Sequence, residues 1–215
     1  MNITNLFSVK NRTALVTGGN SGLGEAMATA LGLAGAQLVL VGRDVKKLEQ
    51  VEQRLTPQNI KVKTIAANLA KLETIAGVAE QAENAFGAID IIINAAGVNL
   101  RESFVTVSPA TWQEQTNIHL GAPFFLTQAI APHMKQRGFG RIINIASLQS
   151  MRAFPNSAPY GAGKGGIVQL TRAIAEEWSR YGINCNAIGP GFFSTPLTAP
   201  VFGNPELVQK HAAQT

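Results

Sequence analysis

The stretch Thr17-Gly18-Gly19-Asn20-Ser21-Gly22-Leu23-Gly24 decides the fold of this chain of 215 residues. It stands between a short apolar run at residues 12–17, typical of a strand, and an alanine- and leucine-rich run at residues 22–35, typical of a helix. Glycines at such a junction permit a tight turn and let the backbone approach a pyrophosphate, whose negative charge suits the helix N-terminus. A glycine-rich turn can be purely structural, but its place between strand and helix favours a dinucleotide-binding site.

Strand and helix patterns alternate along the rest of the chain. Further strands are predicted at residues 37–41, 60–66, 89–94, 141–146 and 183–188. Further helices are predicted at residues 44–55, 72–86, 108–137 with a break near Gly121, 157–181 and 205–213, with Asp44 and Ser108 as N-caps. This alternation predicts a doubly wound, parallel, Rossmann-like α/β sheet within one domain spanning residues 1–215. Ligands of such sheets bind at the carboxyl ends of the strands.

Composition narrows the class of protein. Apolar residues make up 46% of the chain and charged residues 14%, as expected of a globular protein with a buried sheet. The formal net charge is +5, but the basic residues are scattered and no aromatic platform is interleaved with them, so no nucleic-acid partner is predicted. Cys185 is the single cysteine, and we expect it to be buried and to take part in no disulfide or metal site. The first nine residues lack the features of a signal peptide and no membrane span is evident, which makes the cytoplasm the default location.

The glycine spacing, Thr-Gly-x-x-x-Gly-x-Gly, resembles that of the short-chain dehydrogenase/reductase family. The resemblance extends through most of the chain, in this order: Asn94-Ala95-Ala96-Gly97, where the family has Asn-Asn-Ala-Gly, then Asn117, Ser147, Tyr160-Gly161-Ala162-Gly163-Lys164, Pro190-Gly191 and Thr195. It implies hydride transfer between a nicotinamide cofactor and an alcohol or ketone, with Asn117, Ser147, Tyr160 and Lys164 as the catalytic residues.

The resemblance also implies a set of cofactor-binding residues. They are Thr17, Gly18, Asn20, Ser21, Gly22, Leu23, Gly24, Gly42, Arg43, Asn68, Leu69, Asn94, Ala95, Gly97, Tyr160, Lys164, Pro190, Gly191, Phe193 and Thr195. The second strand ends at Val41-Gly42-Arg43 without the acidic residue that binds a ribose 2′-hydroxyl. The planar fork of Arg43 suits a 2′-phosphate, which favours NADP over NAD, although an Arg43 that rests only on the adenine leaves both cofactors open. Asn68 stands where the family usually has an aspartate.

Tyr160 and Lys164 lie four residues apart and so share one face of a helix. A free tyrosine titrates near ~10, and a neighbouring ammonium favours its phenolate. The resemblance implies that Lys164 also holds the nicotinamide ribose, that Ser147 stabilises charge on the substrate oxygen, and that Asn117 holds a water in a proton relay. Since this mechanism assigns no role to histidine, His119 and His133 are interpreted as structural or exposed.

The loops at residues 94–101 and 147–156 resemble those of gluconate 5-dehydrogenases and 2-deoxy-gluconate 3-dehydrogenases. The predicted substrate residues are Arg101, Ser147, Gln149, Arg152 and Tyr160. Two guanidinium groups suit a carboxylate such as that of gluconate or 5-keto-gluconate, whereas an ordinary loop arginine with a surface partner is the alternative for each. The family also implies a mobile substrate lid at residues 192–213. Two other functions stay open: the same chemistry on another carbonyl compound, such as a 3-oxoacyl thioester, and a catalytically inactive nucleotide-binding protein.

Members of the family continue with a further helix and a seventh, edge strand. Six strands are therefore expected in this chain, as in a family member shortened at its C-terminus, with the sixth at an exposed edge. The family also implies a homodimer or homotetramer, with the helices that carry Tyr160 and Asn117 at one interface.

Overall fold

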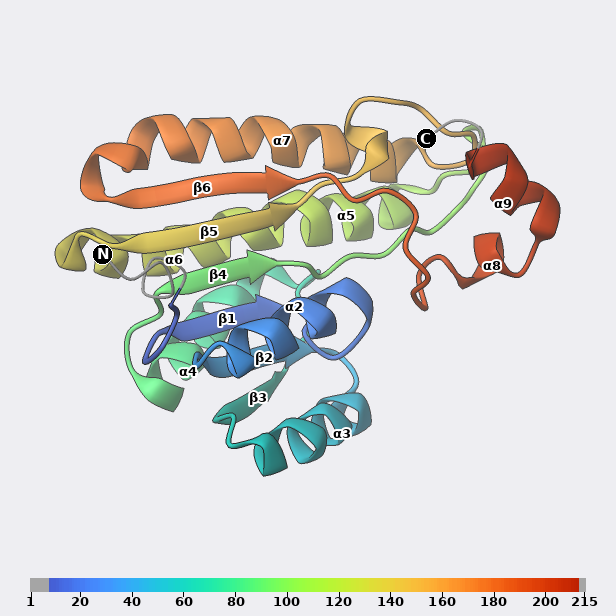
Figure 1. Cartoon of the computed structure of the whole chain (residues 1–215). Helices are drawn as coiled ribbons and strands as arrows, with labels where there is room; N and C mark the ends of the chain where they lie inside the picture. Colours follow the sequence, from blue (N-terminus) through green and yellow to red (C-terminus); the bar gives the residue numbers. More distant parts are fainter. Residues whose placement is uncertain (1–7, 213–215) are drawn as a thin grey trace.

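A computed structural model describes residues 8–212 of the chain as an α/β fold around one parallel sheet (Figure 1). The strands are β1 (Thr13–Thr17), β2 (Gln37–Gly42), β3 (Val62–Ala66), β4 (Ile91–Asn94), β5 (Gly140–Ile145) and β6 (Ile183–Ile188). Their order is β3-β2-β1-β4-β5-β6, and every neighbouring pair is parallel. The predicted six-stranded, doubly wound sheet is confirmed, and the order reverses direction between β1 and β4, where such sheets bind ligands.

Helices cover both faces of the sheet. They are α2 (Gly22–Leu33), α3 (Val45–Leu55), α4 (Ile75–Phe86), α5 (Pro109–Thr116), α6 (Ala122–Arg137), α7 (Ala158–Trp178), α8 (Ala199–Phe202) and α9 (Pro205–Ala212). One apolar core joins α2 and α3 to alternate strand residues such as Val16 and Leu40. The other core joins α4, α6 and α7 to the strand residues that point to the opposite face of the sheet, such as Leu15 and Val41. This two-sided burial explains why the central strands β1, β2 and β4 are almost continuously apolar.

The helix boundaries differ from the sequence pattern in one important place. The helix predicted at residues 108–137 is interrupted by a π-helical segment at Asn117–Gly121, rather than only near Gly121. The predicted caps are confirmed: Asp44 accepts a hydrogen bond from the backbone N–H of Lys47 at 3.1 Å, and Ser108 accepts one from Thr111 at 3.0 Å. Helix α8 was not predicted, since only four residues form it.

All six strands end on the same side of the molecule, and the segment that follows β6, with α8 and α9, lies beyond these ends (Figure 1). In the described part of the chain β6 is the edge strand beside β5, and Ile188 at its end is 47% exposed. Cys185 on β6 is buried, as predicted.

Candidate active site

The glycine-rich turn joins β1 to α2 at the carboxyl edge of the sheet. Gly18 and Gly22 adopt positive φ angles of 66° and 53°, which glycine tolerates without a steric penalty. A Cβ atom on Gly24 would lie 2.3 Å from the backbone oxygen of Gly18, so the turn is folded against the first turn of α2. The close packing leaves the backbone at the start of α2 facing the space above the strand ends, where an anionic group is favoured.

A cleft of about 640 Å³ lies above these strand ends, a size that can hold a cofactor and a small substrate together. It brings together most of the predicted cofactor residues: Gly18, Asn20, Ser21, Gly22, Leu23, Gly24, Gly42, Arg43, Leu69, Ala95, Gly97, Tyr160, Lys164, Pro190, Gly191, Phe193 and Thr195. One cleft is thus lined by three segments that the sequence analysis brings together: the glycine turn, the end of β2 and the loop after β4.

Three predicted cofactor residues do not line the cleft. The Thr17 hydroxyl accepts hydrogen bonds from the N–H groups of Ala95 and Ala96, at 3.1 and 3.2 Å, and so fastens the loop after β4 to β1. The Asn94 amide donates to Asn144 on β5 at 2.8 Å within the buried sheet. The Asn68 carboxamide oxygen accepts from the N–H of Ala70 at 3.1 Å. The hydrogen bonds of Thr17 and Asn94 therefore hold together the strand ends beneath the cleft. The hydrogen bond of Asn68 stabilises only the loop to which it belongs.

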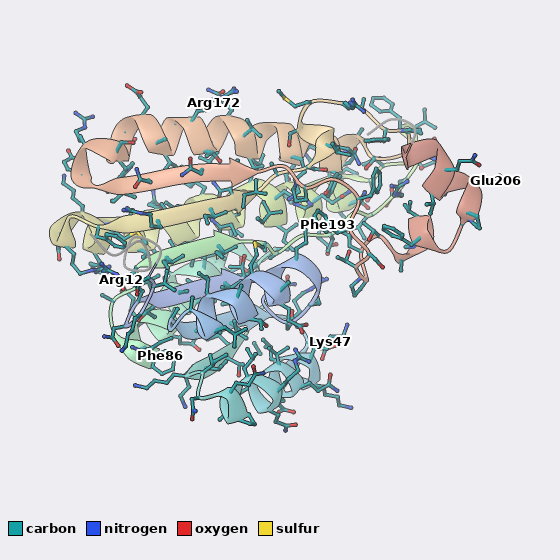
Figure 2. All side chains as sticks on the ribbon, viewed as in Figure 1. Arg12, Lys47, Phe86, Arg172, Phe193 and Glu206 are labelled. Carbon is teal, nitrogen blue, oxygen red and sulfur yellow. The ribbon has the colours of Figure 1, made fainter. Side chains whose placement is uncertain are left out.

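Positive charge gathers at the end of the cleft formed by β2 and α3. Arg43 and Lys47 both line the cleft, and Lys47 is a residue that the sequence reasoning missed. Figure 2 shows Lys47 on α3, on the side of the molecule where the strands end. Arg43 also forms an exposed ion pair with Glu114 at 3.6 Å. The side chain of Asp44 caps α3, so the only acidic residue next to Arg43 in sequence is engaged with the helix N-terminus.

Tyr160, Lys164 and Ser147 meet at the opposite end of the cleft. Tyr160 and Lys164 are 8% and 6% exposed, and the Lys164 ammonium nitrogen lies 5.7 Å from the centre of the Tyr160 ring. Lys164 donates a hydrogen bond to the backbone oxygen of Ile145. Ser147 lies just past β5, where its hydroxyl accepts from the N–H of Gln149 at 3.1 Å and caps a short 3-10 turn.

Burial dominates the electrostatics of this group. It raises the pKa of Tyr160, although a hydrogen bond with Ser147 and the charge of Arg101 act in the opposite direction. It also lowers the pKa of Lys164 to about 8. In the protein alone, desolvation of the buried phenol therefore outweighs the hydrogen bond and the charge that favour the phenolate.

The fourth predicted catalytic residue, Asn117, does not reach the cleft. Its amide donates to the backbone oxygen of Ala70 at 2.8 Å, and its side-chain oxygen accepts from Gln113 at 2.5 Å. Within this segment Ile118 and His119 line the cleft, and the ring of His119 meets that of Tyr160. From the sequence alone, His119 is interpreted as structural or exposed.

The two predicted substrate arginines are placed differently. Arg101 and Gln149 line the cleft, whereas Arg152 lies on the exposed part of its loop outside the cleft. The fully buried Gln115 holds the loop before Arg101, because its amide nitrogen donates to the oxygen of Leu100 and its amide oxygen accepts from the N–H of Leu100, both at 3.3 Å. Neither Gln115 nor this clamp had a sequence signal.

Two kinds of feature are absent from residues 8–212. No three His, Cys, Asp or Glu side chains there are grouped closely enough to hold a metal ion. In the same range no helix is both long and apolar enough to cross a membrane.

A family model described as short chain dehydrogenase matches residues 12–206. The chain belongs to the short chain dehydrogenase family. Among its relatives, gluconate 5-dehydrogenase of Gluconobacter oxydans is 35% identical over 96% of this chain and 80% of the relative. The 2-dehydro-3-deoxy-D-gluconate 5-dehydrogenase of Formosa agariphila is 38% identical over 91% of this chain and 75% of the relative.

A solved structure gives the same assignment. The gluconate 5-dehydrogenase of Burkholderia cenocepacia, crystallised with NADP and tartrate, superposes on this short chain dehydrogenase with a TM-score of 0.89. The two are 33% identical, and the match covers 95% of this chain and 80% of the other. Membership of the family makes the protein an oxidoreductase.

Proposed function

We propose that this short chain dehydrogenase interconverts a sugar acid of the gluconate type and its ketone, with NADP as the hydride carrier. The observation that carries the proposal is the presence of Arg101 in the same cleft as Tyr160, close enough for its charge to act on the Tyr160 phenol. A guanidinium in that position suits the carboxylate of a short substrate whose carbonyl oxygen lies at Tyr160. The names of the two relatives described above favour the same class of substrate.

The cleft fits NADP by three of its features. The glycine turn leaves room at the N-terminus of α2 for a pyrophosphate, since side chains at Gly18 or Gly24 would collide with backbone. Arg43 and Lys47 supply positive charge for a 2′-phosphate. Lys164 uses one of its three N–H donors on Ile145 and keeps two for a nicotinamide ribose and its surroundings.

When bound, the nicotinamide supplies or accepts the hydride. The protein supplies the proton. Because burial raises the pKa of Tyr160, the phenol is protonated at neutral pH and can donate to the oxygen of a ketone as that oxygen gains charge. Ser147 offers a hydroxyl to the same oxygen, and the Lys164 ammonium stabilises the phenolate that remains. In the reverse direction Tyr160 would act as the base in its phenolate form, which the Lys164 ammonium and the positive charge of an oxidised nicotinamide would favour.

The experiment that tests the function follows NADPH absorbance with 5-keto-gluconate, beside a 3-oxoacyl thioester and a panel of uncharged ketones. Turnover of the sugar acid above the others is expected. Preference for the thioester supports the second carbonyl substrate, and NADPH binding with no turnover of any ketone supports an inactive nucleotide-binding protein.

Arg101→Gln is expected to raise the Michaelis constant for 5-keto-gluconate by about 10-fold or more, since a charge-assisted contact contributes roughly 1.5–3 kcal/mol. The Michaelis constant for NADPH is expected to stay the same. Arg152→Gln is the matched control, because Arg152 is a loop arginine outside the cleft. Equal Michaelis constants for the acid in wild type and Arg101→Gln contradict the role of Arg101.

Arg43→Ala combined with Lys47→Ala is expected to weaken NADPH binding by about 10- to 100-fold while leaving NADH binding nearly unchanged, because only NADPH carries the 2′-phosphate. Fluorescence titration with both cofactors measures this. Lys46→Ala, next to Lys47 on α3 but outside the cleft, is the control. If the affinities for NADPH and NADH fall equally, recognition of the 2′-phosphate is contradicted, and a contact of Arg43 with the adenine is favoured.

We also propose that residues 192–212 act as a lid within the same domain as the cofactor site. Phe193, Thr195 and Leu197 line the cleft, and Thr195 packs close to the glycine turn, where a Cβ on Gly22 would meet it at 3.3 Å. Figure 2 shows Phe193 on the segment between β6 and α8, and 54% of its surface is exposed. Closure over a bound substrate excludes water from the reaction. Residue 213, the last of the predicted lid, lies outside the described residues.

The exposed side of α6 supports a proposed homodimer. Phe124 and Phe125 pack edge to face there and are both more than 40% exposed, and α5 packs beside α7. Exposed aromatic pairs are typical of protein interfaces. Light scattering is expected to give the mass of a dimer or tetramer, and Phe124→Ser with Phe125→Ser the mass of a smaller species. An unchanged mass in this variant contradicts an interface at α6.

A further inference from the structure

His119 is the buried histidine of the catalytic end of the cleft. It is 2% exposed, and its ring meets that of Tyr160 edge to face, with the ring centres 5.0 Å apart at 87°. Its Nε2 atom lies 2.7 Å from the backbone oxygen of Val98, the residue after Gly97 in the loop that lines the cleft. Val98 offers an acceptor, so Nε2 carries the proton and Nδ1 carries the lone pair.

The Nδ1 atom of His119 is fully buried and has no hydrogen-bond partner among the described residues. Buried polar atoms are rarely left without a partner. Nδ1 is therefore an acceptor held ready at the catalytic centre, and a donor must approach it there.

Two glycines make the space for this ring. A Cβ on Gly97 would lie 2.8 Å from its Cε1 atom, and a Cβ on Gly163 would lie 2.8 Å from its Cβ atom. The loop after β4 and the first turns of α7 therefore both close on the imidazole. A ring fixed from both sides, and anchored through Nε2, has one orientation for Nδ1.

We propose that His119 is a positioning residue of the proposed catalytic set: its Nδ1 accepts a hydrogen bond from the Lys164 ammonium or from a water that this ammonium holds. Lys164 has the donors to do so, since one of its three N–H groups goes to Ile145. The bond keeps the ammonium beside Tyr160. Asn117, whose amide is bound to Ala70 and Gln113, leaves this place to His119.

The charge state of His119 suits an acceptor. Burial, with a further contribution from the charge of Lys164, lowers its pKa to about 3, against a smaller opposing effect of the bond to Val98. The titratable groups that face it are Lys164 and Tyr160, both on α7. The imidazole is therefore neutral at neutral pH, and the lone pair on Nδ1 is available to a donor.

Two variants separate the two ring nitrogens. In His119→Asn the amide group falls near the position of Nδ1, so an acceptor for Lys164 remains while the anchor to Val98 is lost. In His119→Gln the amide reaches the position of Nε2, so the anchor remains while the acceptor is lost. We expect His119→Gln to lower kcat by about 10- to 100-fold, the scale of a small misplacement of a catalytic group. His119→Asn is expected to keep most of kcat, and both are expected to bind NADPH.

A second measurement does not need turnover. The chain has two tyrosines, so Tyr181→Phe leaves Tyr160 as the only one, and its titration can be followed by ultraviolet difference absorbance. In that background His119→Gln is expected to raise the pKa of Tyr160 further, because the ammonium is no longer held beside it, and His119→Asn is expected to raise it less. His133→Asn, at an exposed histidine paired with Glu83, is the control and should leave kcat and the titration unchanged.

The outcomes are distinct. Equal losses of kcat in His119→Asn and His119→Gln show that His119 only fills space, and they overturn the proposal. Losses of kcat that match the fall in melting temperature of each variant do the same. If the wild type turns over none of the ketones, the proposed function fails on its own, and the Tyr160 titration still decides whether His119 holds Lys164. A Tyr160 pKa that is the same with His119 and with His119→Gln also overturns the proposal for His119.

Discussion

Tyr160→Phe is expected to lower kcat for 5-keto-gluconate reduction by about 10²- to 10⁴-fold, the usual range for loss of a general acid. The phenol is the proposed proton donor at the buried end of the cleft, and phenylalanine keeps its ring against His119 while removing the hydroxyl. NADPH affinity, measured by fluorescence titration, is expected to stay within about fivefold, because a lost hydrogen bond contributes roughly 1 kcal/mol or less when water replaces it. Stopped-flow absorbance at saturating NADPH measures the chemical step.

Tyr181→Phe is the matched control for this change. Tyr181 packs against Trp178 at the far end of α7, with ring centres 6.1 Å apart, and is not part of the cleft. It is expected to leave kcat unchanged. A Tyr160→Phe enzyme with near wild-type kcat contradicts the assignment of Tyr160 as the acid.

The pH dependence of the wild type follows from the same assignment. Ketone reduction needs the protonated phenol, and burial raises the pKa of Tyr160. The rate constant kcat/KM for reduction is therefore expected to be level through neutral pH and to fall as the pH rises through that raised pKa. Alcohol oxidation, which needs the phenolate, is expected to rise over the same alkaline range.

The fold and the glycine-rich lining of the cleft were predictable because their signals are local. Continuous apolar runs at β1 and β4 predict strands buried on both faces, and the glycine spacing at residues 18–24 reflects contacts made within a few residues. The position of Arg43 at the end of β2, where it lines the cleft, was predictable for the same reason. These features depend little on how distant segments pack.

The position of the Asn117 side chain outside the cleft has a physical cause. Asn117 and His119 are two residues apart, which on a helix places them on nearly opposite faces. The π-helical segment at Asn117–Gly121 changes which face meets α7, and nothing in the local pattern predicted it. Arg101 and Arg152 posed a similar problem, because a loop has no periodicity, and only the clamp of Gln115 on Leu100 distinguishes the loop that enters the cleft.

Gly24→Ala is expected to destabilise the protein and to weaken NADPH binding by about 10-fold or more. The new Cβ atom would lie 2.3 Å from the backbone oxygen of Gly18, and a backbone atom cannot move aside as a side chain can. The turn must open, and overpacking of this kind costs about 1–3 kcal/mol. The same movement displaces the backbone of the proposed pyrophosphate site. Chemical denaturation measures the first effect and fluorescence titration the second.

Gly77→Ala is a close control, because it makes the same substitution at the same helical position. Gly24 and Gly77 are each the third residue of a twelve-residue helix, α2 and α4. A Cβ on Gly77 meets no atom within 4 Å, so alanine there is expected to stabilise the protein by up to about 1 kcal/mol through its helix propensity. Opposite signs for the two changes in unfolding free energy therefore isolate the contact with Gly18. If Gly24→Ala were also stabilising and left NADPH binding intact, the turn would not need the close approach, and the proposed pyrophosphate site would lose its structural basis.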